Sequence, residues 1–296
     1  MKKIPLLNPV SPAVKIAFLF IFLFIGLFLV LLFSKVVYLL PGVDGNDIVT
    51  QIYVGAIGQS VFAIGLPAYL VSRWTEDEPL RSLKMDAGVG SIRSVLFILL
   101  VFLCSYSFTS LVGQWNKGFH LPDALSGVEQ VMRDMEDAAL EVTNMMLAGD
   151  SVLRLLLNLI VVAGMAAVSE EMFFRGALQQ FIGERIRNVH ITVWITAAVF
   201  SFVHFQFFGF LPRLFLGAIL GYLFAYSGNL WIPILFHFLN NATVVVLEFF
   251  WGDTQWFENM EDQEITTWFV VIGLISLIVT VILLKTYKNL AYDDRS

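Results

Sequence analysis

Ionisable and amide side chains gather in the second half of this sequence, inside stretches that are otherwise apolar. They form three patterns: Glu170, Glu171 and Arg175 in SEEMFFRG, Phe200 and His204 in FSFVH, and His237 and Asn241 in HFLNN. An ionisable group inside a membrane helix costs about 2.5–3.5 kcal/mol on insertion scales. Each of these groups therefore needs a partner or a function.

Helical spacing predicts which of these side chains act together. Glu171 and Arg175 are four residues apart, with the acid first, which is the favourable order for a helical ion pair. Glu170 lies about 100° further round the helix and has no partner within its own turn. His237 and Asn241, also four apart, project from one face of a later helix. Glu170 is thus the carboxylate left available for chemistry.

A hairpin brings two of the patterns to one depth. The polar turn near Arg187 lies 17 residues after Glu170 and 17 residues before His204. In an antiparallel helix pair these two side chains meet, and His237 can reach the same level from the next turn.

Three uses of such a cluster stay open at this point. In a hydrolase, Glu acts as general base on a water that His or a metal holds, while His and Asn stabilise the oxyanion. In a transporter, the same groups relay protons or ions. In a structural role, they form a buried polar network between helices. The sequence lacks HExxH, GxSxG and a pair of aspartates in its apolar spans, so zincin, serine and aspartyl proteases are not indicated.

The elements that position these groups are membrane helices. The chain is 58% hydrophobic with mean hydropathy +0.78, and only 14% of its residues are charged, against about a quarter in soluble domains. We predict an all-α polytopic bundle forming one membrane domain over 1–296, with a catalytic core at about 150–250. The eight expected spans are 14–33, 52–72, 92–113, 151–174, 190–210, 213–227, 230–250 and 268–284.

The placement of Lys and Arg predicts the orientation. With the N-terminus in the cytoplasm, 13 of the 18 basic residues fall on the cytoplasmic side and 3 fall outside. Both termini are then cytoplasmic, and the first apolar stretch is a retained span rather than a signal peptide. Residues 123–147 alternate apolar and acidic positions at helical spacing, which predicts an amphipathic helix at the outer membrane surface.

Composition also limits the partners. A net charge of −6 without a basic patch argues against a nucleic-acid partner. The lone Cys104 excludes a disulfide framework within one chain. We expect a multi-pass protein of a plasma membrane, with a bacterial inner membrane favoured, whose partners are the lipid bilayer and a membrane peptide or protein substrate.

The three patterns together resemble the signature of the CPBP family, the CAAX-protease and bacteriocin-processing (Abi-type) membrane proteases, which include the Ras-converting-type endopeptidases. That signature is EExxxR, FxxxH and HxxxN, each on its own helix. The resemblance implies an intramembrane endopeptidase in which Glu170 activates water, His204 positions it, and His237 and Asn241 stabilise the oxyanion. It implies supporting roles for Glu171, Arg175 and Phe200.

The resemblance leaves the metal open. The family is often called a metalloprotease, and Glu170, His204, His237 and Asn241 are the residues that would hold a zinc ion, whereas a metal-free glutamate mechanism needs none. The alternatives to a protease are an ion- or proton-coupled transporter and a non-catalytic membrane adaptor or immunity protein. The sequence does not define the substrate, its prenylation or the oligomeric state.

Overall fold

The computed structural model describes residues 10–257 and 264–293, and within these ranges every regular element is a helix. Seven helical stretches of the described chain are long and apolar enough to cross a bilayer. They are α1 (Pro12–Val37); α2 (Ile48–Gly58) with η1 (Gln59–Gly65) and α3 (Leu66–Thr75); α5 (Ile92–Lys117); α7 (Val152–Asn158) with η3 (Leu159–Met165), α8 (Ala166–Glu171), η4 (Met172–Gln179) and α9 (Gln180–Ile186); η5 (Phe207–Gly209) with α11 (Phe210–Ser227); α12 (Trp231–Trp251); and α14 (Thr267–Asp293). The shorter helices are α4 (Pro79–Ser82), η2 (Asp123–Leu125), α6 (Ser126–Leu147) and α10 (Val189–Phe202). The expected helical membrane bundle is confirmed.

The fifth expected span, 190–210, is shorter than the sequence indicates. α10 has 14 residues, about 21 Å of helix against a hydrocarbon core of about 30 Å. The chain turns at 203–206, where Phe205 has a positive φ of 53°, and then returns through α11. The run FVHFQFF is too apolar to signal a turn, and side chains from distant helices satisfy the backbone of the turn instead, as described below.

The fourth span is longer than expected. It was predicted to end at 174, but it continues without a break to Ile186, over 35 residues. Arg175 and Arg185, both counted as cytoplasmic in the sequence analysis, therefore lie inside this helix. The extension is helical because Ala177, Leu178 and Phe181 continue its buried face into the apolar core.

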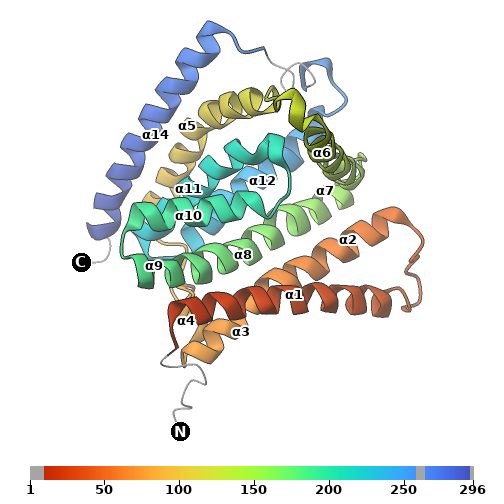
Figure 1. The fold of residues 1–296 in the computed structure, drawn as a ribbon, viewed down its shortest axis with the longest axis horizontal. Helices are drawn as coiled ribbons and strands as arrows, with labels where there is room; N and C mark the ends of the chain where they lie inside the picture. The colour runs from red at the N-terminus through yellow and green to blue at the C-terminus, as the bar shows by residue number, and fades with distance from the viewer. Residues whose placement is uncertain (1–9, 258–263, 294–296) are drawn as a thin grey trace.

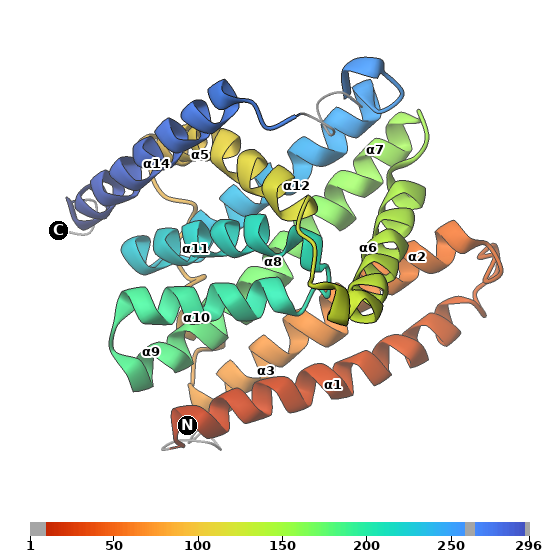
Figure 2. The same cartoon turned by 45° about the horizontal axis from the view of Figure 1, so that its top comes forward.

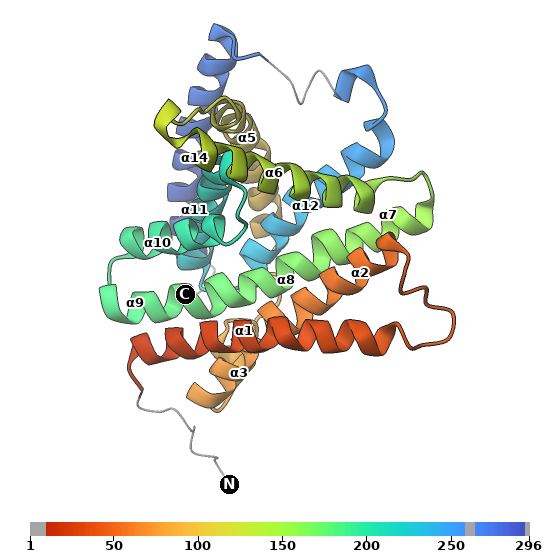
Figure 3. The same ribbon diagram turned by 45° about the vertical axis from the view of Figure 1, so that its right-hand side comes forward.

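The bundle has a central span and two outer edges. α1 and α14 lie at opposite edges, with α8, α10, α11 and α12 between them (Figures 1 and 2). The long span 152–186 runs between the α1–α3 pair on one side and α6 and α12 on the other (Figure 3). Two apolar clusters flank this centre: one joins α1, α3 and η4 around Leu19 and Phe173, and the other joins α5, α11, α12 and α14 around Leu220 and Phe236.

The segment expected as an amphipathic helix at 123–147 is helical over η2 and α6. α6 leaves Val128, Val131 and Leu140 exposed and contacts α2, α7, α12 and η5. It thus lies across the ends of several spans, while its place at the outer membrane surface stays a prediction.

Candidate active site

A buried carboxylate connects two of the three sequence patterns. Oε1 of Glu171 accepts a hydrogen bond from Nη1 of Arg175 at 2.6 Å, so the ion pair expected from the spacing is present. The same oxygen lies 2.8 Å from Nδ1 of His237 on α12. Both side chains of the ion pair are completely buried. An ionised carboxylate only accepts, so His237 must donate its Nδ1 proton here, which leaves Nε2 as its free nitrogen.

Arg175 ties the same cluster to the two neighbouring helices. Its Nη2 donates to the carbonyl oxygen of Gly217 on α11 at 3.0 Å, and its guanidinium carbon lies 4.7 Å from the ring centre of Phe200 on α10. Phe200 is buried, and its ring centre lies 5.0 Å from that of His204 and 5.9 Å from that of His237. Phe200 therefore packs at the point where both histidines meet the arginine.

Glu170 occupies the other side of His237. Its Oε2 lies 3.9 Å from Nε2 of His237, and its side chain is 17% exposed, whereas the side chain of Glu171 is not exposed at all. Its charge also acts on His204, Arg175 and Arg213. The two adjacent acids thus differ: Glu171 is engaged by two partners, and Glu170 faces a histidine across a gap wider than a hydrogen bond.

His204 stands in the turn that follows α10. Its Nδ1 lies 2.7 Å from the carbonyl oxygen of Phe200, which can only accept, so Nδ1 carries the proton. Nε2 is therefore the nitrogen of His204 that remains for a water or a substrate. Each histidine thus has Nδ1 fixed by a hydrogen bond and keeps Nε2 for a water or a substrate.

Asn241 is on the expected helix but makes its hydrogen bonds elsewhere. Its amide nitrogen donates to the carbonyl oxygen of Val162 at 3.2 Å, and its Oδ1 accepts from Asn240 at 3.2 Å. The bond to Val162 attaches α12 to η3 of the central span. Asn241 is thereby placed one helical turn from His237 without a hydrogen bond to it among the contacts of the described chain.

The segment directly after the turn that carries His204, η5 and the start of α11, is held by residues outside the three patterns. Asn116 of α5 donates to the carbonyl oxygen of Phe207 at 3.2 Å and accepts from the amide of Leu211 at 2.7 Å. Glu136 of α6 accepts from the amide of Phe208 at 3.0 Å. Non-helical backbone at membrane depth requires such partners. Sequence reasoning missed both residues, although an asparagine near the end of an apolar span was a usable signal.

Arg213 is a further residue that the patterns did not include. Nη2 donates to Oε1 of Gln206 at 2.7 Å, and Nη1 donates to the carbonyl oxygen of the same residue at 3.1 Å. It brings a second guanidinium into electrostatic range of Glu170. An arginine inside an expected span was the signal for it.

The central span changes from α-helix to π-helix on both sides of the acids. α8, which carries Glu170 and Glu171, has six residues and lies between the two π-helical segments η3 and η4. π-helical turns occur preferentially at functional sites and change the register of the residues that follow. Simple helical spacing did not predict them.

The donor set does not fit a metal ion as arranged. Within the described residues, no three His, Cys, Asp or Glu side chains are grouped closely enough to hold one. Nδ1 of His204 and Nδ1 of His237 are used by Phe200 and Glu171, so Nε2 of each histidine is the nitrogen that could bind a metal. No step of the proposed mechanism passes through a metal.

An apolar cavity of about 670 Å³ lies on the span that carries the acids. It is formed between the second and fourth spans, where Tyr69, Leu159, Ser169 and Met172 line it together with Phe238 of α12. Glu170 and Glu171 follow Ser169 in the sequence but are not among the residues that line the cavity.

Comparison with known proteins identifies the central region. Residues 152–243 match the family model described as Type II CAAX prenyl endopeptidase Rce1-like, which covers all three patterns. The chain is also 29% identical over 89 residues to the uncharacterized protein YpbD of Bacillus subtilis (strain 168), across 29% of this chain and 42% of the relative. The chain thus spans less than half the length of that curated relative. No solved structure shows a significant match. The resemblance to the CAAX-protease family is confirmed by the family model.

Proposed function

We propose that this integral membrane protein, whose residues 152–243 belong to the Rce1-like family, is an endopeptidase that hydrolyses a membrane-associated peptide with Glu170 as general base. The observation that carries the proposal is the division of labour between the two adjacent acids. Glu171 is neutralised by Arg175 and orients His237, while Glu170 is partly exposed and faces Nε2 of that histidine at 3.9 Å.

The chemical step follows from the proton positions. A water hydrogen-bonded to Glu170 and to Nε2 of His204 loses a proton to Glu170 as its oxygen attacks the peptide carbonyl carbon. The carbonyl oxygen becomes a tetrahedral oxyanion. When the C–N bond breaks, the leaving nitrogen takes the proton back from Glu170, which restores the carboxylate.

His237 and Asn241 are proposed to stabilise the oxyanion. When Nε2 of His237 is protonated, Glu171 stabilises the imidazolium from the Nδ1 side, and Nε2–H can donate toward Glu170 or the oxyanion. Asn241 uses one amide hydrogen for Val162, so its second amide hydrogen is available to the substrate. Phe200 and Arg175 act as positioning residues, because the Phe200 ring packs against both imidazoles and the Arg175 guanidinium packs on that ring.

The substrate class is proposed from the apolar cavity on the span that carries the acids. The cavity beside Ser169 is lined mainly by apolar side chains and is about 670 Å³ in volume, which suits a hydrophobic segment of a membrane peptide or a lipid chain attached to it. The family name describes prenyl endopeptidases, so prenylated and unprenylated forms of each peptide belong in the assay.

The test is cleavage of quenched fluorescent peptides by detergent-purified protein, with and without a prenyl group. Glu170→Gln keeps the size of the side chain and removes the base, so turnover should fall by at least about 100-fold. His204→Ala should lower turnover to a similar degree. Glu141→Gln, an exposed carboxylate of α6, serves as the matched control and should cleave as wild type does.

Two results would overturn the proposal. Turnover that survives in both Glu170→Gln and His204→Ala, with folding unchanged, excludes this site as the source of the activity. Transport of protons or ions into proteoliposomes that requires Glu170, together with no cleavage of any peptide, assigns the site to a relay instead.

A further inference from the structure

A hydrolase must admit water and release two polar fragments, and this requirement rests on the proposed function. The cavity between the second and fourth spans is lined mainly by apolar side chains, such as Leu159, Met172 and Phe238. Such a lining suits a membrane peptide better than water or a newly formed charged chain end. The two ends of the central span 152–186 remain as routes, and they are closed in different ways.

The end of the bundle at α9 is closed by a tightly held loop, residues 79–90. Leu83 of this loop is completely buried. The side chain of Gln180 donates to the carbonyl oxygen of Ser82 at 2.9 Å, and the amide of Leu230 donates to the carbonyl oxygen of Lys84 at 2.9 Å. Backbone bonds from the central span and from the start of α12 thus fix the loop in place.

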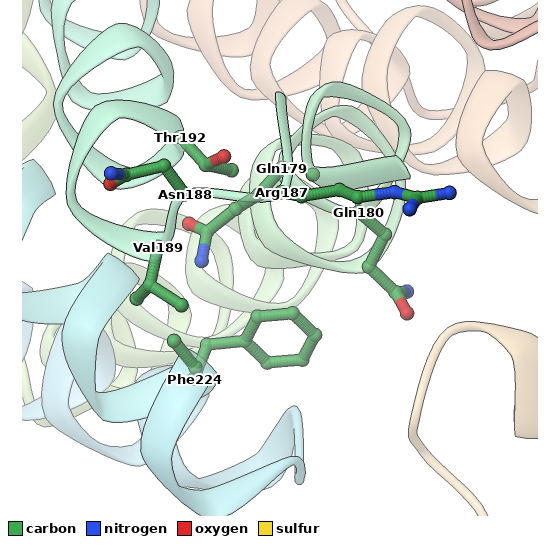
Figure 4. A pocket seen from close by; sticks show the side chains of 9 residues that line it. Gln179, Gln180, Arg187, Asn188, Val189, Thr192 and Phe224 are labelled. Atoms are coloured by element: carbon green, nitrogen blue, oxygen red, sulfur yellow. The ribbon is translucent and has the colours of Figure 1, made fainter. Parts of the chain in front are cut away.

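A pocket of about 280 Å³ at the same end does not reach the acids. Figure 4 shows it at the turn between α9 and α10, with Gln179 and Thr192 among the side chains that line it, and it includes none of the proposed catalytic residues. Gln179 and Arg175 donate to the carbonyl oxygens of Gly221 and Gly217 at 3.0 Å each. The central span is therefore fastened to α11 between this pocket and the acids.

The opposite end of the central span is covered by α6, which is anchored at one end only. Figures 2 and 3 show this helix running from the end of α5, past the turn between α10 and α11, to the start of α7. Of its 22 residues, Met146 and Leu147 are the buried ones, and both lie in its last turn. Asn158 and Arg154 of the central span donate to the carbonyl oxygens of Met146 and Met145 at 3.1 Å each. The rest of α6 lies at the surface.

Two side chains of α6 hold its surface part on η5. Glu136 accepts from the amide of Phe208 at 3.0 Å, and the guanidinium carbon of Arg133 lies 4.1 Å from the ring centre of Phe208. Arg133 is itself paired with Glu129 of the same helix at 2.6 Å. One hydrogen bond and one cation–π contact are individually weak, so this latch of Glu136, Arg133 and Phe208 can break and re-form.

The latch is close to the proposed catalytic residues. Phe208 follows His204 by four residues, directly after the turn that carries this histidine. Arg213 of α11 interacts electrostatically with both Glu136 and Glu170. The latch and the proposed base are therefore neighbours of one guanidinium.

We propose that α6 is a gate over the candidate active site. In the closed position, Glu136 and Arg133 hold the helix on Phe208, and bulk water is kept from the acids. In the open position, α6 pivots about its anchored C-terminal end and releases Phe208, so that water enters and the polar fragments leave. Closure of a surface element over a catalytic site has the same purpose in many enzymes.

The test is the rate at which water-soluble iodoacetamide alkylates a cysteine at position 170, which needs no substrate. Glu170→Cys is combined with Cys104→Ser, so its thiol is the only one in the chain. Adding Glu136→Ala should raise the rate about tenfold, because the latch loses a charged hydrogen bond. Glu136→Gln removes the same charge but keeps an oxygen that accepts from Phe208, so the rate should rise less than about threefold. Asp137→Ala, the exposed neighbouring carboxylate, is the matched control and should leave the rate unchanged.

A second measurement does not depend on position 170. Spin labels on Val131→Cys of α6 and Val244→Cys of α12, both exposed positions, report the distance between these helices in the Cys104→Ser background. The distribution should extend to longer distances when Glu136→Ala is added. An unchanged alkylation rate or an unchanged distribution in Glu136→Ala overturns the gate, and an equal rise in rate in Glu136→Gln and Glu136→Ala shows a charge effect and overturns it too. Neither measurement requires cleavage, so a failure of the proposed protease activity is recognised separately in the peptide assay.

Discussion

The centre of the bundle and the contact between α1 and the second span use different interactions. In the centre, Arg175, Gln179 and Asn241 donate to the carbonyl oxygens of neighbouring helices. At the edge, α1 buries only Leu19 and Gly26 and meets the second span by close approach, since a Cβ on Gly26 would lie 2.1 Å from the carbonyl oxygen of Phe62.

This difference reflects what each region must do. Lipid is as apolar as leucine, so apolar contact alone gives no hydrophobic gain between membrane helices, and small residues that allow close packing supply the attraction at the edges. Polar contacts fix rotation and depth more sharply, because a wrong register leaves a polar group unpaired in hydrocarbon. The candidate active site, where two imidazoles and two acids must be positioned, is held by polar contacts.

The largest effect should come from breaking the polar centre at Arg175. Arg175→Met leaves the completely buried Glu171 without its counter-ion, which costs about 3–5 kcal/mol in comparable buried pairs. The thermal unfolding midpoint in detergent measures it. Arg81→Met, which removes an exposed pair with Glu78, should change stability by less than about 1 kcal/mol and is the control.

A double variant sharpens this prediction. Glu171→Gln combined with Arg175→Met removes the orphaned charge and keeps an acceptor for Nδ1 of His237. It should therefore be more stable than Arg175→Met alone. An unchanged midpoint in Arg175→Met would show that Glu171 is not ionised in the folded protein, and the explanation of His237 given above would fail.

The edge of the bundle should respond to volume instead of charge. Gly26→Ala forces α1 away from the backbone of Phe62 and Ala63, and overpacking of this kind costs about 1–3 kcal/mol. Gly55→Ala is the matched control, since its new Cβ meets nothing within 4 Å and alanine favours a helix. Unfolding in detergent separates the two. Equal midpoints would mean that α1 is not packed tightly on the second span.

A third change acts on the junction between the regions, the turn at 203–206. Asn116→Leu removes the two hydrogen bonds from α5 to η5 and α11, directly after this turn. It leaves the amide of Leu211 and the carbonyl of Phe207 unpaired, at about 1–3 kcal/mol for such a group. His204 then loses its fixed position. Cleavage should fall more than the unfolding midpoint alone explains, while the exposed Asn144→Leu changes neither. A loss of stability with unchanged turnover per folded molecule would separate Asn116 from the site.

Much of the centre could be predicted from the sequence because its patterns are local. Spacing of four residues predicted the ion pair of Glu171 with Arg175 and the common helix of His237 and Asn241. The apolar runs predicted the spans, and a hairpin near Arg187 placed α10 beside the end of the central span.

The rest depends on contacts distant in the sequence. The pairing of Glu171 with His237 joins residues 66 apart, and the early end of α10 depends on Asn116 and Glu136 from other helices. The π-helical segments beside α8 have no sequence signal at the level of apolar spacing. Tertiary contacts override local preference in each case.

The smallest expected effect lies outside the spans, where water weakens ionic contacts that hydrocarbon would strengthen. Glu129 of α6 accepts from the amide of Leu121 at 2.7 Å and pairs with Arg133 at 2.6 Å and His120 at 2.9 Å. The Leu121 amide first, and then Arg133 and His120, lower the pKa of Glu129 from 4.5 to about 2.

Because the pKa of Glu129 is lower in the folded protein, the stabilisation is complete above pH 4.5 and is lost as the pH falls toward 2. The unfolding midpoints of wild type and Glu129→Gln should therefore differ at pH 7, converge below pH 4.5, and approach one another in high salt. The Arg175→Met difference should persist in the same salt series because that pair is buried. If salt abolished the midpoint differences of Glu129→Gln and Arg175→Met equally, the contrast between a buried centre and a solvent-exposed periphery would be wrong.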